Sequence, residues 1–287
     1  MKCKWIKKLT AGIIFLAVVG SLSGCQKAAT SENLFRDIEV NMTSVESAEE
    51  NQIVKLQMGD GDSAISQESN LDIEMTRDPV AVHRKGQQKT NMAGTKETQE
   101  MESYQVEEDG KTVIYSGTDE AWEKNAVEEK DTSSQQTLLF DGLQNLSGAF
   151  TVSQDLATVN KEECFELTGT ISGTQFRETF ADTLEALLGE DSSDLSGWNL
   201  QASEDEDGNT ELQQKLNDVK VDCVIDIYRS NILPAKITFD LTDYLKAAGE
   251  ENAQVTSYTL ELTFVSYNDT KKIKVPKAVK ESAQDNG

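Results

Sequence analysis

Residues 219–241 read VKVDCVIDIYRSNILPAKITFDL and predict two consecutive β-strands. The apolar residues of the first strand alternate with mostly charged ones and therefore share one face: Val221, Cys223, Ile225 and Ile227. The second strand begins at a turn-like Leu233-Pro234-Ala235 segment, and so short a connection leaves no room for a crossover helix. The pair is therefore antiparallel, with one apolar face that other elements have to cover.

The same alternation of apolar and polar residues recurs along most of the chain. Polar turns such as Gly59-Asp60-Gly61-Asp62 separate the segments, and short connections again favour antiparallel pairing. The further strands predicted in this way are 38–42, 53–58, 71–75, 80–84, 101–106, 112–122, 165–171, 256–267 and 271–275. The sequence thus predicts an antiparallel sheet.

A helical period interrupts the strands in two places. In residues 174–188 the large apolar residues recur at helical spacing before a stop at Gly189: Phe176, Phe180, Leu184 and Leu187. Residues 135–146 predict a shorter helix, and short helices are also expected near 211–216 and 244–248. Residues 190–218 are rich in Asp, Glu, Ser and Asn, which predicts a solvated acidic insertion. Strands and helices together indicate an α+β fold.

The net charge argues against a nucleic-acid partner, and the single His argues against a metal site or a catalytic triad. The 287 residues include 27 Lys and Arg, 51 Asp and Glu and one His, for a net charge of −24. A chain so acidic repels phosphate backbones, so no nucleic-acid partner is expected. A single His leaves no His-based metal cluster and little basis for a catalytic triad, so we expect no metal, no cofactor and no enzymatic activity.

The N-terminus predicts export and a lipid anchor. Four Lys precede an apolar run at 9–22 that is too short to span a bilayer, which is typical of a signal peptide over residues 1–24. The run ends in Leu22-Ser23-Gly24-Cys25, which resembles the lipobox of bacterial lipoproteins. That resemblance implies that Cys25 receives a diacylglyceryl group and becomes the mature N-terminus, followed by a short tether to residue 35. Two acyl chains on one residue hold a protein stably at a membrane.

Removal of the signal peptide leaves 23 basic residues against 51 acidic ones, a net charge of −28. Such a body is repelled by anionic lipid headgroups. We therefore expect an extracytoplasmic protein that is tethered to the cell membrane through the Cys25 lipid and otherwise solvated.

Two local motifs are better explained by structure than by chemistry. His83 lies on a polar strand beside Arg84 and Lys85, and no motif joins it to a nucleophile, which favours a structural role. Residues 203–214 match part of a calcium-binding loop but have Ser and Gln where the two strongest carboxylate ligands belong, which favours a solvated loop.

Cys164 and Cys223 are the only cysteines of the mature body besides Cys25. In an exported protein they are candidates for a disulfide. The alternation places Cys223 on the apolar face of its strand and Cys164 on the polar face of another, whereas adjacent strands bridge only residues on the same side. Two separate thiols are therefore the favoured alternative.

Taken together, the sequence resembles the LolA-like bacterial lipoproteins, in the LppX- and LprG-like half-barrel superfamily and its Gram-positive branch. The resemblance rests on YSGTDEAWEK at 115–124, the strand pair at 219–241 and the strand end at Val275-Pro276. It implies an antiparallel half-barrel over residues 36–279, with helices packed on its concave face and a polar tail at 280–287. Members of the superfamily carry lipids or acyl chains between sheet and helices.

This resemblance predicts a lipid-like ligand in a cavity on the concave face, while no protein partner is predicted. The residues expected to line the cavity are Val221, Ile225, Ile227, Ile237, Phe239, Leu260, Leu262 and Phe264. The alternative is a structural or protein-interaction lipoprotein whose concave face is filled by its own helices. A sizeable apolar cavity would distinguish the first from the second.

Overall fold

The computed structural model describes residues 29–60, 64–118, 121–127, 142–188, 210–248 and 254–285. In this part of the chain the strands form one open sheet in the order β12-β6-β5-β4-β3-β2-β1-β11-β10-β9-β8-β7. The β12–β6 ladder is parallel and the other ladders are antiparallel. The strands are β1 (Ser47–Met58), β2 (Ile65–Arg77), β3 (Val80–Met92), β4 (Thr95–Glu108), β5 (Lys111–Thr118), β6 (Ala121–Val127), β7 (Phe150–Val159), β8 (Glu162–Ser172), β9 (Lys220–Tyr228), β10 (Pro234–Asp240), β11 (Val255–Tyr267) and β12 (Gln284–Asp285).

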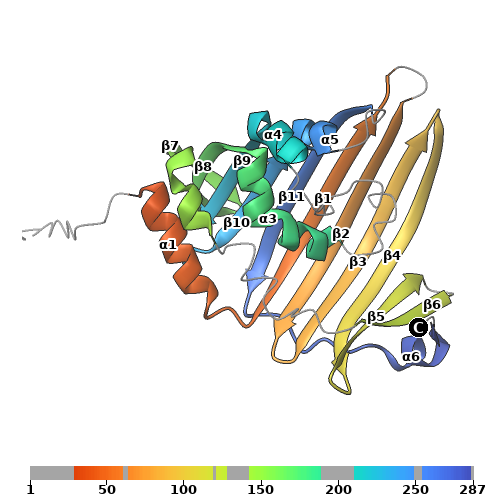
Figure 1. Ribbon diagram of the computed structural model, residues 1–287. Coiled ribbons are helices and arrows are strands. Elements are labelled where there is room, and N and C mark those ends of the chain that lie inside the picture. The colour runs from red at the N-terminus through yellow and green to blue at the C-terminus, as the bar shows by residue number, and fades with distance from the viewer. Residues whose placement is uncertain are drawn as a thin grey trace, which may run out of the picture.

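Helices gather on the concave face of this sheet, as Figure 1 shows. The helices are α1 (Ser31–Met42), the 3-10 helix η3 (Leu143–Ala149), α3 (Gly173–Leu188), α4 (Thr210–Asp218), α5 (Thr242–Ala248) and α6 (Lys277–Ser282). Contacts of the first five are with β7, β8, β9 and β11 and with one another, whereas α6 contacts β6. The expected α+β half-barrel with helices on its concave face is confirmed.

The alternation of apolar and charged residues in β9 explains why one face of the sheet is buried and the other is exposed to solvent. Val221 and Ile225 are buried under the helices, whereas Asp222 between them is exposed on the outer face. On β8 the residue opposite Cys223 is Gly169, where an added Cβ would lie 2.6 Å from the ring of Phe150. The missing side chain makes room for that ring.

The first helix corrects the sequence analysis, because residues 38–42 end a helix and do not form a strand. The buried residues of α1 recur at the spacing of one helical face: Leu34, Phe35, Ile38 and Met42. Thr30 caps the helix, since its hydroxyl accepts a hydrogen bond from the backbone N–H of Asn33 at 3.3 Å. The folded body therefore begins within the segment that was expected to be a tether.

The C-terminus also differs from expectation. Residues 271–275 form no strand, and the predicted polar tail at 280–287 contains the end of α6 and all of β12. Ile273, Val275 and Val279 pack on the outer face of the sheet against an aromatic cluster that includes Tyr104 and Trp122. The apolar residues of this segment are thus buried by a distant part of the sheet, without pairing as a strand.

Other predicted elements are changed in extent or lie outside the described residues. The segment 112–122 falls into two strands, β5 and β6, which pair as neighbours. Most of the helix predicted at 135–146 lies outside the described residues, and its end belongs to η3. The acidic insertion lies outside them up to residue 209, and its last part is α4. β7, the edge strand, was missed.

The helices at 174–188 and 244–248 are confirmed as α3 and α5. None of the helices in the described ranges is long and apolar enough to cross a membrane.

Candidate functional site

The residues predicted to line a cavity come together on the concave face. Cross-strand pairs join Leu262 to Ile237 and Ile237 to Ile225, so neighbouring strands present them side by side. All of them belong to one hydrophobic core and are 0–3% exposed: Val221, Ile225, Ile227, Ile237, Phe239, Leu260, Leu262 and Phe264. They are packed rather than open, and their contact with a ligand stays a prediction.

Aromatic side chains from the helices fill the space above β10. The ring of Phe176 on α3 lies 5.3 Å from that of Phe239 and 5.0 Å from that of Tyr244 on α5. Phe180, one helical turn later, lies 5.0 Å from Phe239. These are edge-on contacts of the kind that stabilise aromatic clusters. The sheet under α3 and α5 is therefore closely packed.

Beside this packed region, the concave face continues onto β1 and β2 with apolar side chains that are only half buried. We call Val54, Met58, Ile65 and Leu71 the apolar strip. Met58 is paired with Ile65, and Leu71 lies opposite Gln52. Their place on the concave face follows from the register, because Val54 is paired with Leu260 of the core.

Polar residues lie at one end of this strip. Glu50 and Gln52 point to the same face as Val54, since they are paired with Phe264 and Leu262 of the core. They are 3% and 2% exposed, and among the described residues Glu50 Oε1 and Gln52 Nε2 have no hydrogen-bond partner. Such groups are costly to bury and call for an explanation.

Arg84 completes this group, which we call the polar end of the strip. It lies on β3 in the same cross-strand row, where Glu50 is paired with Ile73 and Ile73 with Arg84. Burial raises the pKa of Glu50 to about 7, against the opposing effect of Arg84. Burial also lowers the pKa of Arg84, which Glu50 opposes. Opposite charges thus offset one another in a region that disfavours both.

Sequence reasoning missed the polar end. The alternation was followed only from residue 53, where the apolar residues of β1 begin. Extending the same period backwards would have placed Glu50 and Gln52 on the face of Val54 and Leu56. No sequence signal connects Arg84 with Glu50 and Gln52, because strand β2 lies between β3, which carries Arg84, and β1, which carries the other two.

A cavity of about 470 Å³ lies at the ends of β1, β2, β3 and β11 and shares Ile65 with the apolar strip. Its lining is mixed, with Gln57, Ser66 and Asn91 among the polar residues and Ala64 and Ile65 among the apolar ones. It falls in the size range of ligand sites but lacks their mainly apolar lining. It is not the apolar cavity expected of a lipid carrier.

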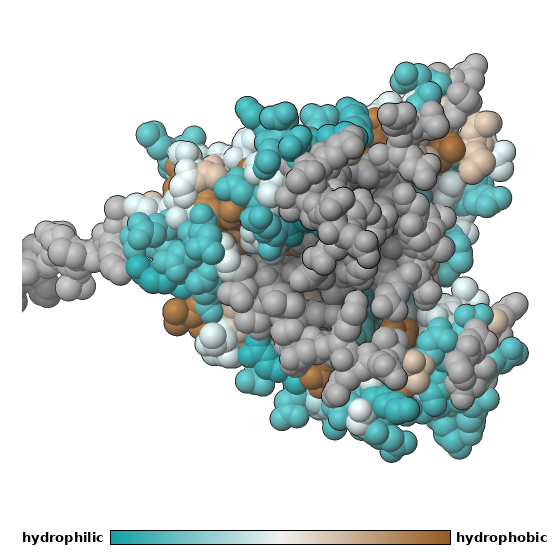
Figure 2. Space-filling view, in the orientation of Figure 1, coloured by the Kyte–Doolittle hydropathy of each residue, from teal (hydrophilic) through white to brown (hydrophobic). Residues whose placement is uncertain are grey.

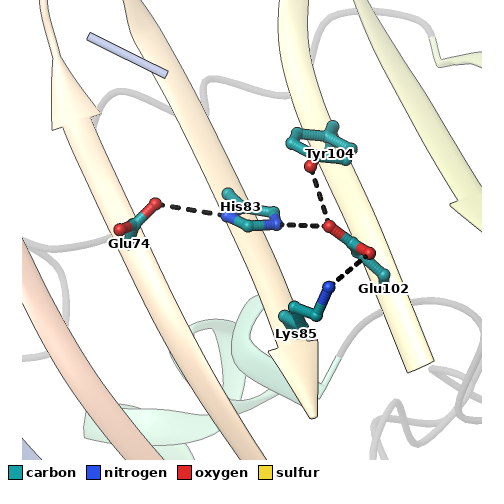
Figure 3. Close-up of polar contacts among 5 residues, drawn as sticks. All are labelled: Glu74, His83, Lys85, Glu102 and Tyr104. Atoms are coloured by element: carbon teal, nitrogen blue, oxygen red, sulfur yellow. Dashed lines mark hydrogen bonds and ion pairs between the residues drawn. The ribbon is translucent and has the colours of Figure 1, made fainter. Parts of the chain in front are cut away.

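The outer face carries a polar network around His83 (Figure 3). The two ring nitrogens of His83 lie 3.2 Å from Glu74 Oε2 and 2.9 Å from Glu102 Oε1. Lys85 Nζ and the Tyr104 hydroxyl donate to Glu102 at 3.0 and 2.8 Å, and the rings of His83 and Tyr104 stack at 4.3 Å. The five side chains come from β2, β3 and β4.

The electrostatics of this network agree with the structural role expected of His83. Partial burial acts to raise the pKa of Glu102, but hydrogen bonds from His83, Tyr104 and Lys85 outweigh it and lower that pKa. Burial and the hydrogen bond to Glu102 raise the pKa of Tyr104. Each member is held by another, so the network ties three strands together.

The cysteines of the body are two free, buried thiols. Cys164 packs with Tyr228 and Ala235, whereas Cys223 belongs to the core under the helices. They lie on opposite faces of β8 and β9, with Cys164 paired to Tyr228 and Cys223 to Gly169. A bond between them would have to cross the sheet, so this geometry favours the two separate thiols over the disulfide candidate. Cys25 lies outside the described residues.

The surface offers few hydrophobic side chains. Figure 2 shows a mainly hydrophilic covering with small, separate hydrophobic areas on the described part of this view. In the described ranges, no group of three or more His, Cys, Asp and Glu is arranged to hold a metal ion.

Residues 30–284 match the model of a protein family described as "Family of unknown function (DUF6612)". The chain belongs to this family. The match spans the described body from the cap of α1 to β12. No curated protein matches the chain.

Solved structures resemble this DUF6612 protein in layout. Lipoprotein LppX of Mycobacterium tuberculosis is 13% identical with a TM-score of 0.44, covering 85% of this chain and 98% of its own. LprF of Mycobacterium bovis is 11% identical with a TM-score of 0.43, covering 86% and 96%. A LolA superfamily protein of Nitrosomonas europaea is 9% identical with a TM-score of 0.23, covering 88% and 97%. These likenesses concern the fold.

Proposed function

We propose that this protein is a membrane-anchored extracytoplasmic lipoprotein that binds a hydrophobic or amphipathic ligand on the concave face of its sheet. The anchor is the lipid on Cys25. α1 begins at Ser31, six residues later, and six residues reach at most ~20 Å when extended. The folded body is therefore held beside the membrane, where it meets acyl lipids at high local concentration.

The observation that supports binding is the apolar strip. Its side chains lie next to the close-packed core yet stay half buried, so they offer apolar area that a ligand is able to cover. From Glu50 to Met58 the strand extends ~26 Å, which suits a long acyl chain. The proposed binding surface is thus the apolar strip on β1 and β2. The predicted lining residues on β9 to β11 lie beside it and belong to the packed core.

The second candidate is a structural or protein-interaction lipoprotein. The aromatic packing of Phe176, Phe180 and Phe239 favours it, because it leaves the region under α3 filled. We propose no catalytic role. Among the described residues His83 contacts two carboxylates and a Tyr ring, and no Ser or Cys hydroxyl or thiol is bonded to it.

Titration with an environment-sensitive apolar dye tests ligand binding. The mature body should bind the dye saturably, and Leu71→Asp should weaken binding at least tenfold, because it places a charge in the apolar strip. Leu156→Asp is the matched control, since Leu156 is 43% exposed on edge strand β7. Absence of saturable binding, or equal binding by both variants, would favour the structural role.

A further inference from the structure

The polar end of the strip contains two buried hydrogen-bonding atoms that have no partner among the described residues. Glu50 Oε1 accepts when the carboxyl is ionised, and Gln52 Nε2 donates. The cross-strand neighbours of these residues are apolar, with Phe264 and Ile73 beside Glu50 and Leu262 beside Gln52. The paired residues on the adjacent strands therefore supply no partner to either atom, and a group bound on the concave face would be able to supply one.

The two atoms differ in kind, which restricts that group. An acceptor on Glu50 and a donor on Gln52 are both satisfied by hydroxyl groups, because a hydroxyl donates and accepts. Above pH 7, where Glu50 is mainly a carboxylate, an ester or a hydrocarbon chain donates nothing to it and leaves Oε1 unpaired. A polyol such as glycerol or a sugar has several hydroxyls and is able to serve both side chains.

The charges around the polar end also favour an uncharged head group. Glu50 and Arg84 share the site, so an anionic head is attracted by one and repelled by the other. The body as a whole carries a large negative charge, which further disfavours anionic ligands. An uncharged head group is repelled neither by Glu50 nor by the negative charge of the body. It also loses less solvation energy on burial than a charged one.

We propose that Glu50 and Gln52 bind the hydroxyls of an uncharged head group, a glycerol or a sugar, on an acyl lipid whose chain lies along the apolar strip towards Met58 and Ile65. This inference rests on the proposed ligand-binding function and adds the class of ligand and its direction. The head lies at the polar end, and the tail lies towards the tips of β1 and β2.

Three probes with the same acyl chain test the head group: monooleoylglycerol, methyl oleate and oleate. Each is titrated into the mature body in competition with the apolar dye. Monooleoylglycerol should bind at least tenfold more tightly than methyl oleate, which lacks hydroxyls, and more tightly than oleate, which is charged.

Variants of β1 connect any preference to the two side chains. Gln52→Leu should reduce the preference for monooleoylglycerol over methyl oleate to about twofold or less, with methyl oleate binding unchanged. Lys55→Leu is the control on the same strand, because Lys55 is exposed on the opposite face. Glu50→Gln should keep part of the preference, since an amide oxygen still accepts from a hydroxyl.

The outcomes separate the two proposals. If all probes bind with similar affinity, or if Gln52→Leu keeps the full preference, ligand binding stands and the head-group assignment is wrong. If oleate binds most tightly, the ligand is anionic and the assignment is also wrong. If no probe binds, the proposed function itself fails.

Discussion

Removal of the Phe176 side chain tests whether α3 closes the core over the sheet. Phe176 is 1% exposed, and its ring lies 5.6 Å from Phe180, 5.3 Å from Phe239 and 5.0 Å from Tyr244. Truncation of a buried Phe to Ala costs ~3–5 kcal/mol through lost burial and the cavity that remains. Each aromatic contact adds ~0.5–1.5 kcal/mol to burial alone, so we expect about 4 kcal/mol or more for Phe176→Ala.

Urea unfolding of the mature body, followed by circular dichroism, measures this loss directly. A protein of this kind has only ~5–15 kcal/mol of stability, so the midpoint should shift far below that of the wild type. Val40→Ala is the control, because Val40 is 62% exposed on α1, and it should change stability by less than ~0.5 kcal/mol. A loss below ~1.5 kcal/mol for Phe176→Ala would refute the packed core and reopen the region under α3 to a ligand.

Further predictions concern the anchor, the thiols and pH. Cys25→Ser should abolish acyl labelling and release the protein from the membrane fraction while its circular dichroism is unchanged; membrane retention would contradict the anchor. A soluble fragment that starts at Gln26, denatured without reductant, should titrate with two thiols, and a value of zero would mean a disulfide between Cys164 and Cys223. Burial raises the pKa of Glu50 from 4.5 to about 7 against the opposing charge of Arg84, and Glu50 in turn raises the pKa of Tyr267. The folded state therefore holds a proton that the unfolded chain releases between these pH values, so this contribution to stability is complete below pH 4.5 and is lost as pH rises through about 7. Unfolding free energies at pH 5 and pH 8 should differ less in Glu50→Gln than in the wild type, and an equal difference would contradict the raised pKa.

Much of the fold follows from periodicity in the sequence. The alternation around Ile225 and the helical spacing of Phe176 and Phe180 each report which side of one element is apolar, and the structure confirms both. Residues 38–42 show the limit of this reasoning. Ile38 and Met42 fit a strand and a helix equally well, and only Leu34 and Phe35 upstream, buried against the rest of the body, distinguish the two.

The candidate site was less accessible to sequence analysis. The residues predicted to line a cavity are on the concave face, but alternation cannot tell a side chain in a cavity from one in a packed core, because both are apolar. Glu50 and Gln52 were missed for the opposite reason. A polar residue in a sequence is normally exposed, and its burial depends on segments far away in the chain.

The sequence by itself determined where this protein is expected to lie, its acidic character and its antiparallel sheet with one apolar face, since these depend on composition and local period. Tertiary structure alone decided how that face is divided. The rings of α3 and α5 fill the part over β10, while β1 brings Glu50 and Gln52 beside half-buried apolar side chains. Strand order and register place these groups together, and no local pattern encodes contacts between segments so far apart.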